Sequence, residues 1–323
     1  MSSVLGIDIA KGSFDIAIQQ SNGKFRTKGN LPNNPQGFQV LQAWLAKHVT
    51  ADAWIVMEAT GVYHHALAEF VYSLGYRVCV VNPACICSYA KSLLQRVKTD
   101  KVDAKLIALY AQRHADQLKA WQPQAPAQRR LQALVRRLED LKGIEQMEHN
   151  RLDVSDVSVQ ASIRSVIQHL EQQIATTLKA IKDHINDDPD LRDQRDLLVS
   201  INGISDKTAA LLLAELGNPL RFRDSRAVVA FAGLNPRLQE SGKHKGHVCI
   251  SKMGPSSLRA GLYMPAVVAM THNPAVKALS ERLKAKGKSG KQIVCAAMRK
   301  LLHIAYGVLK SGKPFDAQLA IAH

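Results

Sequence analysis

Acidic residues are scarce in this 323-residue sequence, and its cysteines are few and unpaired. It holds 27 Asp plus Glu against 43 Lys plus Arg, a formal net charge of +16. The five cysteines are an odd number without a Cys-x-x-Cys pair, so we expect no disulfide framework, no zinc site and a cytoplasmic protein with reduced thiols. Because long apolar runs and a signal peptide are also missing, no membrane partner is expected.

Aromatic residues are few as well, whereas positive charge is concentrated toward the C-terminus. Between Arg237 and Lys313 there are 15 Lys plus Arg against two acids, Glu240 and Glu281. Such asymmetry is typical of a nucleic-acid-binding face; the alternative is a solvated surface that serves solubility. With only three Trp and seven Tyr, stacking on bases is not expected to be the main mode of contact.

The first 120 residues predict an α/β domain. The apolar run Val4–Ile9 suits a buried strand, and Asn22-Gly23 is a hairpin signal between two further strands. Three meandering strands are followed by helix, strand, helix, strand and helix, an order that fits a ribonuclease-H-like sheet. The later elements are expected at 35–48, 53–58, 63–74, 77–81 and 102–114, the last helix with Thr99 or Asp100 as its N-cap.

The rest of the chain predicts helices. Apolar residues three or four apart from Ile163 to Ile185 indicate an amphipathic helix, which either forms a coiled coil or packs on its own domain. Around Gly203, helix, hairpin and helix follow one another, either as a phosphate-binding hairpin or as a plain connection. We therefore expect an α/β domain at 1–125, a helical coiled-coil region at 126–190 and a mainly α domain with a helix-hairpin-helix at 191–323.

Four acids stand where such a sheet would bring them together. Asp8 interrupts the first strand, Glu58 ends the fourth, and Asp100 and Asp103 begin the last helix. Each alone has a structural explanation, such as a strand end, an N-cap or a helix-dipole contact. Together they would repel one another, a cost that a divalent metal ion removes, and hard oxygen ligands suit Mg²⁺. Strand-cutting enzymes need such converging carboxylates.

Several motifs resemble those of the DEDD insertion-sequence transposases, relatives of the Piv DNA invertase with an N-terminal domain similar to the RuvC Holliday-junction resolvase. In the N-terminal domain they are Gly6-Ile7-Asp8-Ile9-Ala10-Lys11, Glu58-Ala59-Thr60-Gly61-Val62-Tyr63, Asn82-Pro83 and Lys98-Thr99-Asp100-Lys101-Val102-Asp103-Ala104. Further along they are Ser200-Ile201-Asn202-Gly203-Ile204, Phe231-Ala232-Gly233-Leu234-Asn235-Pro236-Arg237, Glu240-Ser241-Gly242, Leu262-Tyr263-Met264-Pro265-Ala266 and Ala305-Tyr306-Gly307-Val308-Leu309-Lys310. The resemblance spans nearly the whole chain.

The resemblance implies a recombinase with a composite site. It implies that Asp8, Glu58, Asp100 and Asp103 hold Mg²⁺, with Mn²⁺ as a substitute, and that Ser241 forms a covalent phosphoserine link with DNA. It also implies donor and target DNA duplexes, a structured non-coding guide RNA, and dimers that assemble into a tetramer in the bacterial cytoplasm at the nucleoid. From the residues alone, Ser241 is a loop serine before glycine, and the nearby Ser251, Ser256 and Ser257 are equal candidates for the nucleophile.

Basic residues near Ser241 and beyond it are candidates for nucleic-acid contacts. Lys243, His244 and Lys245 could stabilise the charge of the phosphorane or grip flanking phosphates. The other candidates are Arg237, Lys252, Arg259, Lys286, Lys288 and Lys291. The last three also fit a loop that makes no fixed contact.

Three other functions fit parts of the sequence. A metal-dependent nuclease or junction resolvase would use the acids and leave Ser241 idle. A sugar-kinase-like or actin-like ATPase would use Gly6 to Lys11 as a phosphate-binding turn, but it needs a second Gly-rich loop that the sequence lacks. A non-catalytic scaffold would not need all four acids and the serine.

Overall fold

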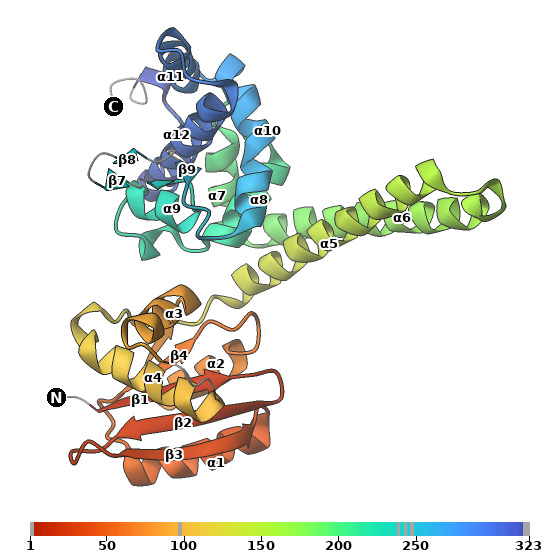
Figure 1. Ribbon diagram of the computed structural model, residues 1–323. Coiled ribbons are helices and arrows are strands. Elements are labelled where there is room, and N and C mark those ends of the chain that lie inside the picture. Colours follow the sequence, from red (N-terminus) through yellow and green to blue (C-terminus); the bar gives the residue numbers. More distant parts are fainter. Residues whose placement is uncertain (1–2, 96–98, 238–239, 242–243, 246–248, 319–323) are drawn as a thin grey trace. The chain divides into compact units, whose positions relative to one another are not determined.

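The computed structural model describes residues 3–95, 99–237, 240–241, 244–245 and 249–318 (Figure 1). The chain divides into two units, Met1–Pro123 and Gln124–His323, each with its own hydrophobic core. Unit 1 is an α/β domain and unit 2 is mainly helical.

Unit 1 is built on one five-stranded sheet of order β3-β2-β1-β4-β5. β1 to β3 run antiparallel and β1, β4 and β5 run parallel, so the predicted adjacency of the first and fourth strands is confirmed. The third strand runs from Phe25 to Pro32. The strands are β1 (Val4–Ile9), β2 (Ser13–Gln19), β3 (Phe25–Pro32), β4 (Trp54–Glu58) and β5 (Arg77–Val81).

Two pairs of helices cover the two faces of this sheet (Figure 1). α1 (Pro35–His48) and α2 (His65–Ser73) pack on the face to which Leu5 and Ile7 contribute. α3 (Pro83–Ser92) and α4 (Asp100–Arg113) pack on the opposite face, and a short 3₁₀ turn at Ala115–Gln117 follows. Successive side chains of a strand point to opposite faces, so Val4, Gly6 and Asp8 lie on the α4 side.

The sequence pattern does not predict α3. Asn82-Pro83 directly follows the strand expected at 77–81 and fits the end of that strand, but in the structure the Asn82 side chain accepts a hydrogen bond from Ala84 N at 2.9 Å and caps a helix. Pro83 stands at the first helical position, where its fixed φ and missing N–H carry no penalty. The same dipeptide therefore ends one element and begins the next.

Gly6 allows α4 to lie directly on β1. A Cβ atom at Gly6 would lie 2.3 Å from Ala104 O and 2.4 Å from Ala108 N, closer than side-chain carbons approach backbone atoms. The helix backbone thus crosses the strand at this glycine. The contact fixes where the first turn of α4, which carries two of the predicted acids, lies along β1.

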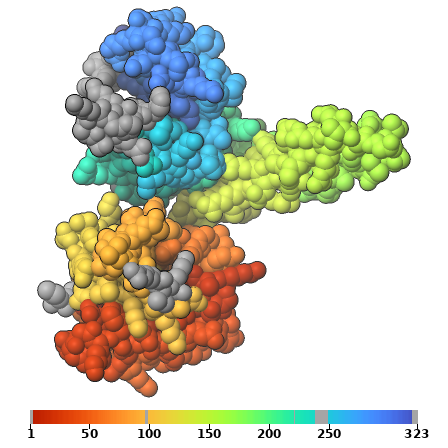
Figure 2. Space-filling view, in the orientation of Figure 1, coloured from red at the N-terminus to blue at the C-terminus, as the bar shows by residue number. Residues whose placement is uncertain are grey.

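Unit 2 begins with two long helices that pack against each other as an antiparallel pair. They are α5 (Pro126–Val154) and α6 (Val157–Asp187), and they extend from the rest of unit 2 as a rod (Figure 2). Five apolar residues spaced along α6 are buried, which confirms the predicted amphipathic helix: Ile167, Leu170, Ile174, Ile181 and Ile185.

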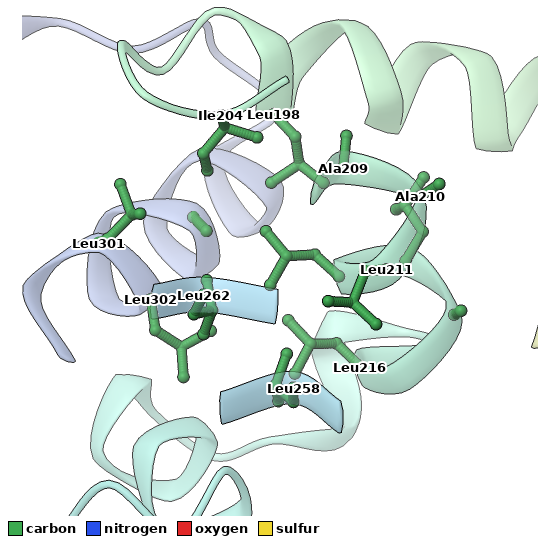
Figure 3. Close-up of a cluster of buried hydrophobic side chains, with 14 of the residues drawn as sticks. Leu198, Ile204, Ala209, Ala210, Leu211, Leu216, Leu258, Leu262, Leu301 and Leu302 are labelled. Carbon is green, nitrogen blue, oxygen red and sulfur yellow. The ribbon is translucent and has the colours of Figure 1, made fainter. Parts of the chain in front are cut away.

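The remaining helices of unit 2 form one core with the base of this pair. Figure 3 shows the part of this core between Leu198 and Leu302. Leu131 and Leu138 of α5 belong to the same core as Leu198 and Leu302. α12 is long and apolar enough to cross a membrane by length and composition, but most of it is buried in this core. The helices are α7 (Pro189–Val199), α8 (Asp206–Leu216), α9 (Ser225–Phe231), α10 (Ser256–His272), α11 (Pro274–Ala285) and α12 (Gly290–Ser311), with a 3₁₀ turn at Pro219–Arg221.

The glycine hairpin between α7 and α8 packs against α10. Gly203 has a φ of +103°, and a Cβ there would lie 2.8 Å from the Cβ of Ala269. The buried Asn273 side chain donates a hydrogen bond to Asn202 O at 3.2 Å. Positive φ and close packing together account for a glycine at this position.

Candidate active site

Asp8 and Glu58 lie side by side at the carboxyl edge of the sheet. β1 and β4 are parallel neighbours in which Ile7 pairs with Met57, and the two acids are the next residue on each strand. Both side chains are half-buried. Because Asp8 and Gly6 lie on the same face of β1, Asp8 points to the side covered by α4.

Asp100 and Asp103 come to the same place from the first turn of α4. The helix begins at Asp100 after Thr99, whose carbonyl accepts the Asp103 N–H at 2.8 Å. Residues three apart in a helix share a face, and α4 packs on β1 and β2. The contact at Gly6 therefore brings the first turn of α4 toward the end of β1.

The pKa of Asp8 reflects the presence of these neighbouring acids. Burial, followed by the negative charges of Asp103, Asp100, Glu58 and Asp15, raises the pKa of Asp8 from 3.8 to about 6. Four other carboxylates thus act on one carboxyl group. The other three acids predicted from the sequence are thus all close enough to act on Asp8.

Asp15 is a fifth acid, which was not among the residues predicted from the sequence. It stands directly opposite Asp8 in the register of β1 and β2, is only 6% exposed and accepts the Asn30 N–H at 3.3 Å. The alternation of β2 suggested an ordinary polar position. Pairing the two strands across their hairpin would have placed Asp15 beside Asp8, because residues directly opposite in an antiparallel pair lie on the same face.

This donor set fits a hard divalent cation. The groups are carboxylate oxygens, which are the ligands that Mg²⁺ and Mn²⁺ prefer. Their mutual repulsion, visible in the raised pKa of Asp8, is relieved when a cation binds between them. A carboxyl group with a pKa of about 6 is also largely ionised, and so ready to bind, at neutral pH.

The loop after Glu58 borders the acids and exposes apolar side chains. Val62 is 61% exposed and Tyr63 is 42% exposed, while Gly61 has a φ of +51°. His64 is buried and its ring stacks on His65 at a centroid distance of 4.2 Å. Burial, and to a lesser extent the neighbouring His65, lowers the pKa of His64 to about 4, so this imidazole is neutral at physiological pH.

Ser241 lies in unit 2 on a very short strand pair. β7 (Glu240–Ser241) runs antiparallel to β8 (His244–Lys245), with Ser241 opposite His244. Lys243 and Gly242 lie outside the described residues. A second short pair, β6 (Pro236–Arg237) with β9 (Cys249–Ile250), flanks this segment in the sequence and places Arg237 opposite Cys249.

One of the competing serines already has a structural partner. The Ser257 hydroxyl donates a hydrogen bond to Oε1 of the buried Glu215 at 3.0 Å. Ser251 continues the chain after β9, where its N–H donates to Asn235 O at 2.8 Å. Ser256 begins α10.

The predicted nucleic-acid contacts differ in their surroundings. Nη1 of Arg259 donates to three carbonyl oxygens, those of Ala232, Gly254 and Pro255, at 2.9–3.2 Å, so this side chain holds a loop together. Lys252 has a φ of +56° and is exposed. Arg237, Lys286, Lys288 and Lys291 are exposed too.

Two known transposase families match this chain. A family described as "Transposase", the DEDD type of the IS110 group, matches residues 5–154. The family described as "Transposase IS116/IS110/IS902 family" matches residues 195–281. The two matches cover the carboxylate edge of unit 1 and the serine segment of unit 2, so the chain is a DNA recombinase of the transposase class.

Full-length relatives give the particular family. The chain is 37% identical to the pilin gene-inverting proteins of Moraxella bovis and Moraxella lacunata, over 98% of each protein and of this chain. It is 26% identical to the transposase for insertion sequence element IS1328 of Yersinia enterocolitica, over 97% of this chain and 98% of that protein. The chain belongs to the IS110 family of transposases.

Proposed function

We propose that this protein cuts and rejoins DNA at specific sites, and so moves or inverts a DNA segment, through a Mg²⁺-dependent carboxylate centre and a covalent phosphoserine intermediate. Asp8, Glu58, Asp100 and Asp103 hold the metal and Ser241 is the nucleophile. The observation that carries the proposal is the position of these acids: Asp8 and Glu58 end neighbouring parallel strands, and the helix that begins with Asp100 and Asp103 packs on β1.

Each residue has a defined task in this reaction. The acids hold Mg²⁺, which when bound polarises the phosphoryl oxygens of the scissile phosphate. Oγ of Ser241 forms a bond to phosphorus, and the bond from phosphorus to the leaving deoxyribose oxygen breaks. The serine proton passes to solvent, and the leaving oxygen takes up a proton. A phosphodiester is exchanged for a phosphoserine ester, so the reverse step rejoins strands without an external energy source.

The partners follow from the same proposal. Donor and target DNA duplexes bind to the basic surface of unit 2, and a structured non-coding RNA guides their pairing. α5 and α6 act as a coiled coil between protomers, in dimers that assemble into a tetramer. The hairpin around Gly203 contributes a helix-hairpin-helix contact to a phosphate. Co-purification followed by sequencing of the bound nucleic acid, with and without ribonuclease treatment, tests the guide.

Trapping the covalent adduct tests the chemistry. Wild-type protein with DNA that carries the element ends should give a protein–DNA adduct that needs Mg²⁺ and survives denaturation. Ser241→Ala and Asp8→Asn should both abolish it, whereas Ser251→Ala should retain it. An adduct that persists in Ser241→Ala would overturn the serine assignment, and full activity of Asp8→Asn would overturn the metal site.

A nuclease without serine chemistry is the second candidate. It is favoured by one observation, namely that the acids which raise the Asp8 pKa all belong to unit 1. In that case Ser241→Ala would still cut DNA at the wild-type rate, and the cut ends would carry no protein.

A further inference from the structure

A single side-chain amide joins the two loops that follow the principal acids of the sheet. Asn33 stands between β3 and α1. Its Nδ2 donates one hydrogen bond to Ala10 O and another to Tyr63 O, each at 3.1 Å. Its backbone N–H donates a third to Gly12 O at 3.0 Å. Asn33 therefore links three separate segments of unit 1.

Both acceptors of the amide lie just beyond a proposed metal ligand. Ala10 is the second residue after Asp8, at the point where β1 ends. Tyr63 lies in the loop that leads from Glu58 at the end of β4 to α2. Within β1 and β4 the two strands are held by their ladder, whose last pair is Ile7 and Met57. Asp8 and Glu58 lie beyond that pair, and the Asn33 amide links the two segments that follow them.

The chemistry of this link is specific to a primary amide. A carboxamide nitrogen has two N–H groups, and here each meets a different carbonyl oxygen. Aspartate has nearly the same shape but cannot donate, and its charge would face two carbonyl oxygens. Serine could donate to only one of them. The loop at Tyr63 also exposes the side chains of Val62 and Tyr63, so apolar burial contributes little to holding it.

We propose that Asn33 is a positioning residue that sets the spacing of Asp8 and Glu58 for a divalent cation. It acts through the backbone of the two loops and touches neither acid. This inference rests on the proposed metal-binding role of these acids, and goes beyond it by naming a residue that controls how tightly they bind the cation.

Cation-dependent thermal stability of the full-length protein without DNA provides the test. Mn²⁺ or Mg²⁺ is titrated while the melting temperature is recorded for wild type, Asn33→Asp, Asn33→Ala and Asn33→Ser. Changes in groups that orient metal ligands lower metal affinity about 10-fold to 100-fold. Because Asn33 acts indirectly, we expect the cation concentration for half-maximal stabilisation to rise about 10-fold, the lower limit of that range, in Asn33→Asp and Asn33→Ala. Asn33→Ser should fall between these variants and wild type.

The adjacent asparagine supplies a matched control. The Asn34 side chain accepts the Gly37 N–H at 3.0 Å and caps α1, away from both loops. Asn34→Ala should lower the melting temperature without shifting the cation midpoint. If the Asn33 variants lose stability but keep the wild-type midpoint, their role is structural only and the inference is wrong.

A further control separates this inference from the proposed function. Asp8→Asn should lose the stabilisation by cations. If wild type and Asp8→Asn respond alike, the proposed metal site is wrong and the inference falls with it. If Asp8→Asn loses the response to cations while the Asn33 variants keep the wild-type cation midpoint, as Asn34→Ala does, the metal site stands and the positioning role is rejected. Cleavage at saturating cation should return toward the wild-type rate in Asn33→Ala, which a merely unfolded variant would not do.

Discussion

The acids of unit 1 and the serine segment of unit 2 are built in opposite ways. Asp8 and Glu58 end strands of a five-stranded sheet, and α4 is pressed against that sheet at Gly6. Ser241 stands on a two-residue strand that pairs with another of the same length. A fold can hold charges in a repulsive cluster only where packing opposes the repulsion.

Removal of a single charge from the carboxylate centre should have the largest effect. We expect Asp8→Asn to slow DNA strand cleavage about a thousandfold, equal to about 4 kcal/mol of transition-state stabilisation, because one cation ligand is lost. DNA binding through the basic surface should persist. Cleavage rates and filter-binding affinities of the same preparation measure both quantities. If Asp8→Asn also lost its affinity for DNA, the proposed division between cleavage by the acids of unit 1 and DNA binding by unit 2 would be wrong.

A methyl group at Gly6 should break the packing on which the acids depend. Gly6→Ala places a Cβ 2.3 Å from Ala104 O, so α4 must move. Overpacking of this kind costs about 3 kcal/mol of unfolding free energy, and the displaced Asp100 and Asp103 should weaken cleavage as well. Urea denaturation measures the loss. Gly12→Ala, where a Cβ meets nothing within 4 Å, should remain close to wild type.

The pH dependence of stability should reveal the repulsion among the acids. The pKa of Asp8 is raised from 3.8 to about 6, so without divalent cations the folded state favours the protonated form. This contribution is fully present below the unfolded pKa and is lost as pH rises through about 6. At neutral pH, Asp8→Asn should therefore be more stable than wild type by about 1–2 kcal/mol, a value discounted for the solvent exposure of the carboxyl group.

Matched measurements at pH 4 and pH 7.5 check the sign of this effect. The gain from Asp8→Asn should be present at the higher pH, nearly absent at the lower pH, and reversed when Mg²⁺ is added. The exposed Asp116→Asn serves as the control for loss of one negative charge. An equal gain in Asp116→Asn would attribute the effect to net charge and not to the cluster.

How far the sequence predicts each region depends on what fixes its geometry. Strand alternation and helix periodicity predict the sheet, and with it the meeting of Asp8, Glu58, Asp100 and Asp103. Asp15 is missed because its role depends on hairpin register, and α3 is missed because Asn82-Pro83 both ends a strand and caps a helix. The link through Asn33 depends on three loops, and local patterns do not encode contacts between loops.

The basic residues of unit 2 should show the smallest effects, and they should fall into two kinds. Lys288 is exposed in the segment between α11 and α12, so Lys288→Ala should weaken DNA binding alike for all sequences and lower the salt slope by about one. Arg259 already donates to three carbonyl oxygens, which are exposed or partly buried, so Arg259→Ala should lower the unfolding free energy by about 1 kcal/mol. Affinity measured over a series of salt concentrations, together with urea denaturation, separates the two. If Arg259→Ala changed the salt dependence of DNA affinity more than Lys288→Ala did, Arg259 would be mainly a phosphate contact and its hydrogen bonds to the loop would be secondary.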